Sequence, residues 1–173
     1  MTDDAATPNP DDDLATVRRI LTSARTATVT SRAASGALHS RPLALLEHGV
    51  DGTENFAGSL WFFTADPSEK TDEIRRHPEV NVSVADGKGH LSLSGRASID
   101  RSQARIDLLW NPWAEAYFEG GREDPAVALL RVDVDSIEFW DLDRPALRRV
   151  VEVAAALIAH RPPEIGESRT VEL

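Results

Sequence analysis

The chain lacks cysteine, and basic residues are scarce beside acidic ones among its 173 residues. Without cysteine there is no disulfide bond, no thiolate nucleophile and no cysteine-based metal site. The 19 Lys and Arg residues against 29 Asp and Glu residues give a formal net charge of −10. A nucleic-acid-binding surface needs clustered Lys and Arg, so this balance argues against nucleic acid as a partner. It leaves room for a small local cationic pocket.

Long apolar runs are also missing. No stretch is long and apolar enough to span a bilayer, and residues 1–10 are acidic and hold no apolar segment of the kind a secretory signal needs. We therefore predict a cytoplasmic protein with no membrane partner. Residues 1–10 contain Pro, Asn and Asp with nothing to bury, so we expect a disordered acidic tail there.

Several familiar catalytic patterns are absent. There is no Gly-x-Ser-x-Gly nucleophile elbow and no glycine-rich phosphate loop. The histidines form no helical i, i+4 pair and show no ligand spacing with a carboxylate; they are His39, His48, His77, His90 and His160. The sequence therefore predicts no metal site.

The chain does contain a succession of short strand patterns. Alternating and β-branched runs predict a hairpin over residues 25–47, a strand over 60–64, a hairpin over 80–94, and two strands over 126–134 and 137–142. Apolar spacing and caps predict helices over 14–21, 66–77, 100–110 and 147–158, with an irregular aromatic stretch over 111–124. Six to seven antiparallel strands joined by tight turns favour a small closed or nearly closed barrel. We expect one domain over residues 11–160 and an extended tail over 161–173.

The most informative segment runs from Leu60 to Lys70. Leu60–Phe63 is a short apolar and aromatic run, typical of a strand packed on both faces. Asp66 is suited to cap a helix, Pro67 to occupy its first position, and Glu69 follows Asp66 by three residues. This is the capping-box pattern with proline at the first helical position. It predicts a helix that begins directly after the strand.

Ser68 and Lys70 lie in the first turn of this predicted helix. A helix start presents unpaired N–H groups and the positive end of the helix dipole, so it attracts anions. A hydroxyl and an ammonium there suit a phosphate. The alternative is that Ser68 is an ordinary surface residue and Lys70 is solvated.

Placed on these elements, several motifs together resemble one family. The chain resembles the pyridoxamine 5′-phosphate oxidase-like flavin-binding split barrels, and within them the general stress protein branch, over roughly residues 14–170. The motifs that carry the resemblance are Arg41-Pro42-Leu43, Trp61-Phe62-Phe63-Thr64 through Ser68-Glu69-Lys70, Pro78-Glu79-Val80, Tyr117-Phe118 through Asp124-Pro125, and Ile137-Glu138-Phe139-Trp140.

The resemblance implies a split β-barrel that binds FMN at a homodimer interface. By carry-over, Arg41 and Lys70 hold the phosphate with Ser68 as a hydroxyl donor, Phe63 and Thr64 lie beside the flavin, and Trp140 reaches it from the partner chain. A polar ligand one strand later falls at His90 or Ser92. The candidate cofactor-binding residues are thus Arg41, Pro42, Leu43, Phe63, Thr64, Ser68, Lys70, His90 and Trp140.

The resemblance implies a stress-related protein that carries out FMN-dependent oxidation or reduction of a small-molecule substrate. The flavin itself exchanges hydride or electrons, so we nominate no catalytic side chain. Two departures from the family pattern matter. Glu69 stands where the oxidase has an Arg, and residues 143–150 lack the oxidase's substrate-binding His. We therefore do not expect pyridoxamine phosphate to be the substrate. The alternatives are a non-catalytic flavin-binding stress or regulatory protein, and a related barrel that uses FAD, deazaflavin or haem.

Two groups of residues have more than one interpretation. His39 shares a strand face with Arg41, so it contacts either the cofactor or a structural hydrogen-bond partner. Trp110, Trp113 and Tyr117 either pack on a bound ring or cover the barrel mouth or a dimer contact.

Overall fold

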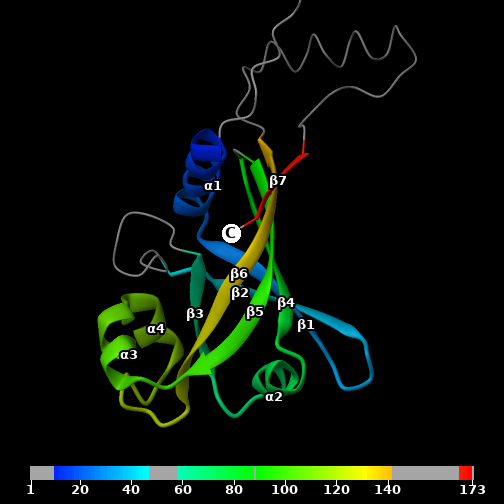
Figure 1. The fold of residues 1–173 in the computed structure, drawn as a ribbon. Helices are drawn as coiled ribbons and strands as arrows, with labels where there is room; N and C mark the ends of the chain where they lie inside the picture. The colour runs from blue at the N-terminus through cyan, green and yellow to red at the C-terminus, as the bar shows by residue number, and fades with distance from the viewer. Residues whose placement is uncertain (1–9, 47–57, 88, 142–167, 173) are drawn as a thin grey trace, which may run out of the picture.

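The computed structural model describes residues 10–46, 58–87, 89–141 and 168–172, which form a curled antiparallel sheet with helices around it (Figure 1). The seven strands of the sheet run in the order β2-β1-β4-β5-β6-β3, with β7 paired to β6. The helices of these ranges are α1 (Pro10–Ser23), α2 (Glu69–Arg76), α3 (Gln103–Leu109) and α4 (Pro112–Tyr117). The strands are β1 (Thr26–Arg32), β2 (Leu38–Ala44), β3 (Ser59–Ala65), β4 (Glu79–Asp86), β5 (Gly89–Asp100), β6 (Val127–Asp141) and β7 (Ser168–Glu172).

The sheet closes on itself through β6 and β3. β5 pairs with β6 along almost all of its length, while the other edge of β6 pairs first with β3 and then with β7. The chain just after β2 returns to β3, where the Leu46 amide donates to the Trp61 carbonyl over 3.3 Å. Strands curled in this way form a split barrel, so the predicted fold class is confirmed.

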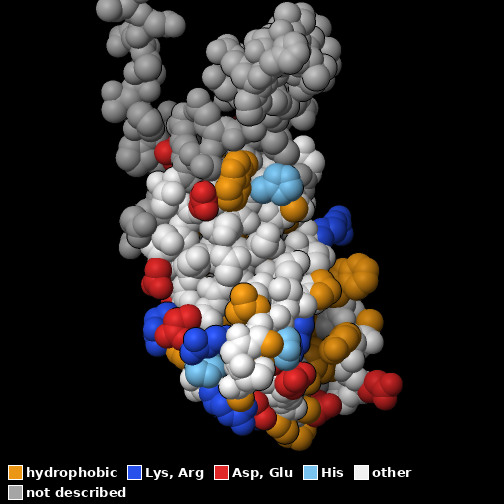
Figure 2. All heavy atoms as spheres, turned by 90° about the vertical axis from the view of Figure 1, so that its right-hand side faces the viewer, with side chains coloured by type: hydrophobic (Ala, Val, Ile, Leu, Met, Phe, Trp, Pro, Cys, Tyr) orange, Lys and Arg blue, Asp and Glu red, His pale blue; other side chains and the backbone are white. Residues whose placement is uncertain are grey.

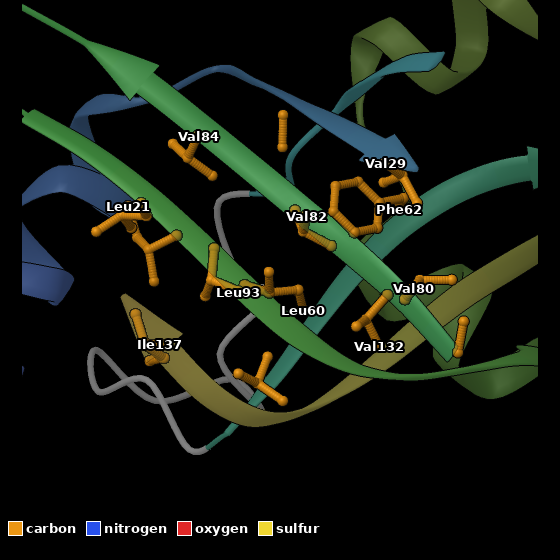
Figure 3. Close-up of a cluster of buried hydrophobic side chains, with 14 of the residues drawn as sticks. Leu21, Val29, Leu60, Phe62, Val80, Val82, Val84, Leu93, Val132 and Ile137 are labelled. Atoms are coloured by element: carbon orange, nitrogen blue, oxygen red, sulfur yellow. The ribbon is translucent and has the colours of Figure 1, made fainter. Parts of the chain in front are cut away.

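Two apolar clusters pack against the two faces of β3. The larger lies inside the barrel, where Leu60 and Phe62 meet Val29, Val82 and Leu93 from the other strands (Figure 3). The smaller lies outside and is covered by α3 and α4; its buried members include Trp61, Leu129, Ile106 and Leu109. Because β3 is packed on both faces, its apolar run does not alternate with polar residues. This confirms the interpretation of Leu60–Phe63.

Several predicted elements differ from the structure. The helix after β3 begins at Glu69 rather than at Asp66. The next helix, α3, is capped by Ser102 and not by Asp100, whose carboxylate instead accepts from the Ser102 amide. The stretch predicted to be irregular contains α4, which is capped by Asn111.

The two last predicted strands are one strand, β6, because β5 pairs with it on both sides of Asp135, where the register shifts. The other edge of β6 pairs with β3 up to Asp133 and with β7 from Ser136. Residues 168–172 of the predicted tail form β7. Pro10, the last residue of the tail predicted over residues 1–10, begins α1, while residues 1–9 and the helix predicted over 147–158 lie outside the described residues. No helix of the described ranges is long and apolar enough to cross a membrane.

Candidate functional site

The start of α2 is built by a capping box that differs from the predicted one. Ser68 is the N-cap, its hydroxyl accepts from the Thr71 amide, and the Thr71 hydroxyl accepts from the Ser68 amide. Ser68 is therefore already engaged by its own helix. The prediction that Asp66 caps the helix is wrong, because its carboxylate has other partners.

Asp66 is a buried ionic anchor between β3 and α2. Its side chain is fully buried and accepts from Arg75 at 2.7 Å and from Arg101. Burial raises the pKa of this carboxyl, but hydrogen bonds from Arg75, Thr71 and Arg101 outweigh it and lower the pKa to about 2. Arg101 also donates to the Pro125 carbonyl at 3.0 Å. The anchor thus ties the start of α2 to the end of β5 and the start of β6.

A second buried carboxylate, that of Glu73, lies under the β1–β2 hairpin. It accepts from Arg41 Nη1 at 2.8 Å and from the Ser31 hydroxyl at 2.6 Å, and His39 Nδ1 lies 2.6 Å from its other oxygen. The hydrogen bond from Arg41 is the main cause that lowers the pKa of Glu73 to about 2, against the opposing effect of burial. Glu73 therefore stays ionised and holds the Arg41 guanidinium beside α2.

Lys70 is a second cation of this region. Its side chain is half-buried, and within the described residues it forms no ion pair. Burial lowers the pKa of Lys70, and the positive charge of nearby Arg41 lowers it further. Two cations held near each other, one of them partly removed from water, are stabilised by a bound anion. Lys70 and Arg41 are therefore candidates to hold an anion such as a phosphate.

The same place holds a group of donors with the spacing of a metal site. Ligand atoms of His39, Glu69 and Glu73 lie within 4.8 Å of one another. Arg41 Nη2 lies 3.3–3.4 Å from an atom of each of the three. The guanidinium is therefore the cation of this cluster, and a metal ion would have to displace it.

Phe63 and Thr64, predicted to lie beside the flavin, occupy opposite faces of β3 just before the turn into α2. Thr64 is buried and donates to the Ala65 carbonyl. Phe63 is half-buried and packs edge-on against Trp110, with 5.4 Å between ring centroids, and against Phe118 at 6.3 Å. An aromatic cluster therefore adjoins the end of β3.

The remaining candidate residues divide between the two faces of the sheet. Leu43 shares the face of Arg41 and packs against the interior, whereas Pro42 is exposed on the outer face. His90 of β5 pairs directly with Trp140 of β6. This pair lies at the end of β5 next to α1, where Gly89 adjoins Ile20. The opposite end of the sheet carries α2 (Figure 1). One chain thus brings Arg41, Ser68 and Lys70 together but keeps His90 and Trp140 away from them.

Sequence reasoning missed Glu73, Ser31 and the role of Asp66. The available signal for Glu73 was its place beside Ile74, which faces the core. Of the two interpretations of His39, the structure shows the hydrogen bond to a structural partner, Glu73.

The three aromatic residues of the α3–α4 region differ in exposure. Trp113 and Tyr117 are exposed on α4, while the Trp110 indole donates to Glu115 at 2.6 Å.

Comparison with known proteins identifies the family of this chain. The model of the family described as "Pyridoxamine 5'-phosphate oxidase like" matches residues 12–164. Protein bli-3 of Neurospora crassa is 28% identical over 79% of this chain and 68% of its own length. General stress protein 26 of Bacillus subtilis is 23% identical over 61% of this chain and 73% of its own length.

A crystal structure described as the general stress FMN/FAD binding protein from Xanthomonas citri is 28% identical. The match covers 78% of this chain and 92% of that one, with a TM-score of 0.65. The family model spans most of the chain, and the split barrel agrees with it. The chain therefore belongs to the pyridoxamine 5′-phosphate oxidase-like family, in its general stress protein 26 branch.

Proposed function

We propose that this chain binds a flavin mononucleotide, with its phosphate at Lys70 and Arg41. The observation that carries the proposal is a half-buried Lys70 that has no acidic partner among the described residues and lies near a guanidinium that Glu73 fixes in place. A phosphate dianion is well matched by an ammonium, a guanidinium and the N–H groups of a helix start. The name of the Xanthomonas citri relative, an FMN/FAD binding protein, supports the same ligand class.

A second chain completes the proposed site. Trp140 and His90 lie at the far end of the sheet from Lys70, so they reach the same ligand only if a partner chain brings them. The outer face of β1, β2, β4 and β5 is suited to such a partner. Its middle carries uncharged side chains, among them Thr28, Thr30, Ser40, Asn81, Ser83, Ser92 and Ser94.

Figure 2 shows this face as a broad uncharged area, with charged side chains gathered at the level of α2. In a chain of net charge −10, two copies meet here without burying like charges against each other. We therefore propose a homodimer that packs across this face.

The proposed reaction class is flavin-dependent oxidation or reduction of a small molecule. The flavin supplies the hydride or electron exchange, and the protein supplies orientation and electrostatics. Lys70 and Arg41 fix the phosphate end, while Phe63 and its aromatic neighbours provide an apolar surface near the end of β3. Residues 143–150, which lack the oxidase's histidine in sequence, lie outside the described residues. Because the sequence lacks that histidine, we do not expect pyridoxamine phosphate to be the substrate.

Titration with FMN tests the binding proposal. We expect saturable quenching or enhancement of flavin fluorescence with about one FMN per chain, and weaker binding of riboflavin because it lacks the phosphate. Flavin fluorescence that does not change at micromolar protein would contradict the proposal.

Two further measurements separate the alternatives. The absorbance spectrum of the purified protein separates flavin from deazaflavin and haem, and turnover with NADH or NADPH separates an enzyme from a non-catalytic binding protein.

Light scattering of the flavin-loaded protein tests the dimer. We expect twice the chain mass of 18.9 kDa. Trp140→Ala should weaken FMN and riboflavin alike, because the contact proposed for the indole is with the flavin ring that both ligands share. A mass of one chain with flavin bound would refute the two-chain site.

A further inference from the structure

The Arg41 guanidinium is shared between two carboxylates of very different character. Glu73 is buried, with 3% of its side chain exposed, and contacts Arg41 at 2.8 Å. Glu69 is 75% exposed and contacts Arg41 Nη2 at 3.3 Å. The buried pair is fixed by further hydrogen bonds from Ser31 and by the His39 contact. The exposed pair has no such support, and an ion pair of this kind contributes little to stability.

The charges around the proposed phosphate position cancel. Arg41 and Lys70 contribute two positive charges, and Glu69 and Glu73 contribute two negative charges. Glu73 is saturated by its partners and lies under the hairpin. Glu69 is adjacent to Lys70 in the chain and reaches the same guanidinium that a phosphate would use. A ligand phosphate and the Glu69 carboxylate therefore compete for Arg41.

We propose that Glu69 is a specificity-determining residue: a displaceable internal counter-ion that weakens binding of phosphorylated ligands at this site. The inference rests on the proposed function. A phosphate that binds must first release the Arg41–Glu69 contact and then lie close to a like charge. An uncharged flavin meets neither cost. The acid at this position therefore reduces the preference of the site for FMN over riboflavin.

The test is a charge series at residue 69, measured by FMN and riboflavin titration of the full chain. Glu69→Gln should tighten FMN binding by about three- to tenfold, and Glu69→Lys should tighten it further. Riboflavin affinity should stay within about twofold in both. Asp72→Asn is the matched control, since Asp72 is an exposed acid of the same helix that contacts Arg75 and not Arg41. It should leave both ligands within about twofold of the unmodified chain.

The outcomes separate the two proposals. If the unmodified chain prefers FMN to riboflavin but Glu69→Gln leaves FMN unchanged or weaker, the role of Glu69 is wrong and the phosphate site stands. The same conclusion follows if Glu69→Gln tightens both ligands equally, or if Asp72→Asn tightens FMN as much. If neither the chain nor any variant binds FMN, both proposals are wrong. Glu69 is exposed, and equal thermal unfolding of the variants verifies that each is folded.

Discussion

Lys70→Ala should lower FMN affinity by about tenfold to more than a hundredfold and leave riboflavin nearly unchanged. A charge-assisted hydrogen bond contributes roughly 1.5–3 kcal/mol, which corresponds to that range in Kd. Riboflavin has no phosphate, so it loses no contact. Titration of both ligands by flavin fluorescence gives the two affinities, and their ratio is the quantity that the phosphate assignment predicts.

The substitution should not disturb the fold. Lys70 forms no ion pair within the described residues, so its removal leaves no buried acid without a partner, and it relieves the repulsion from Arg41. Arg76→Ala is the control, because Arg76 is an exposed cation at the other end of the same helix. It should change neither affinity by more than about twofold. An equal loss for both ligands in Lys70→Ala would mean that the residue acts through folding or through the ring.

Arg41→Ala is a less clean test of the same site. Arg41 is the main partner of the buried Glu73 carboxylate, so its removal leaves that charge uncompensated. We still expect weaker FMN binding, but the loss would combine a missing phosphate contact with a disturbed hairpin. Thermal unfolding of Arg41→Ala should therefore show a destabilisation that Lys70→Ala does not.

Acid should unfold the protein through two buried carboxylates. The pKa values of Asp66 and Glu73 are lowered to about 2 by their arginine and hydroxyl partners, from ordinary values of 3.8 and 4.5. A carboxyl whose pKa is lower in the folded state stabilises the fold above its unfolded pKa, and that contribution is lost as pH falls toward the folded value. Each should contribute on the order of 2–3 kcal/mol at neutral pH. The free energy of unfolding should therefore fall between about pH 5 and pH 2.

Asp66→Asn isolates one of the two groups. The variant should lose about 2 kcal/mol at pH 7, because Arg75 and Arg101 lose a charged acceptor, and its further loss on acidification should be smaller by a similar amount. Urea unfolding at a series of pH values measures the loss of stability at pH 7 and the further loss on acidification. Asp72→Asn, which removes an exposed acid, is the comparison. If the stability of Asp66→Asn fell with acid as steeply as that of the unmodified chain, the anchor would not be the acid-sensitive element.

Local patterns were enough to predict most of the secondary structure. The alternation over residues 25–47 predicted the β1–β2 hairpin, since β1 buries one face, β2 half-buries one face, and a short turn joins them. The Leu60–Phe63 run predicted a strand covered on both faces, which the two clusters around β3 confirm. The helix start was predicted two to three residues early. Asp66 suits an N-cap as well as Ser68 does, and the ion pairs of Asp66 with Arg75 and with the distant Arg101 decide between them.

The sequence by itself determined the family, the split barrel and a set of candidate cofactor residues, because these depend on short motifs in a given order. Tertiary structure decided how the charges pair. Glu69, Asp72 and Glu73 are three acids of one short helix, and nothing in their local spacing says which one meets Arg41 from a strand some thirty residues earlier. The curvature that lays the β1–β2 hairpin against α2 buries Glu73, exposes Glu69 and leaves Lys70 without an acid from the part of the chain that the structure describes. Ion pairing depends on distance and burial, and the fold alone sets both.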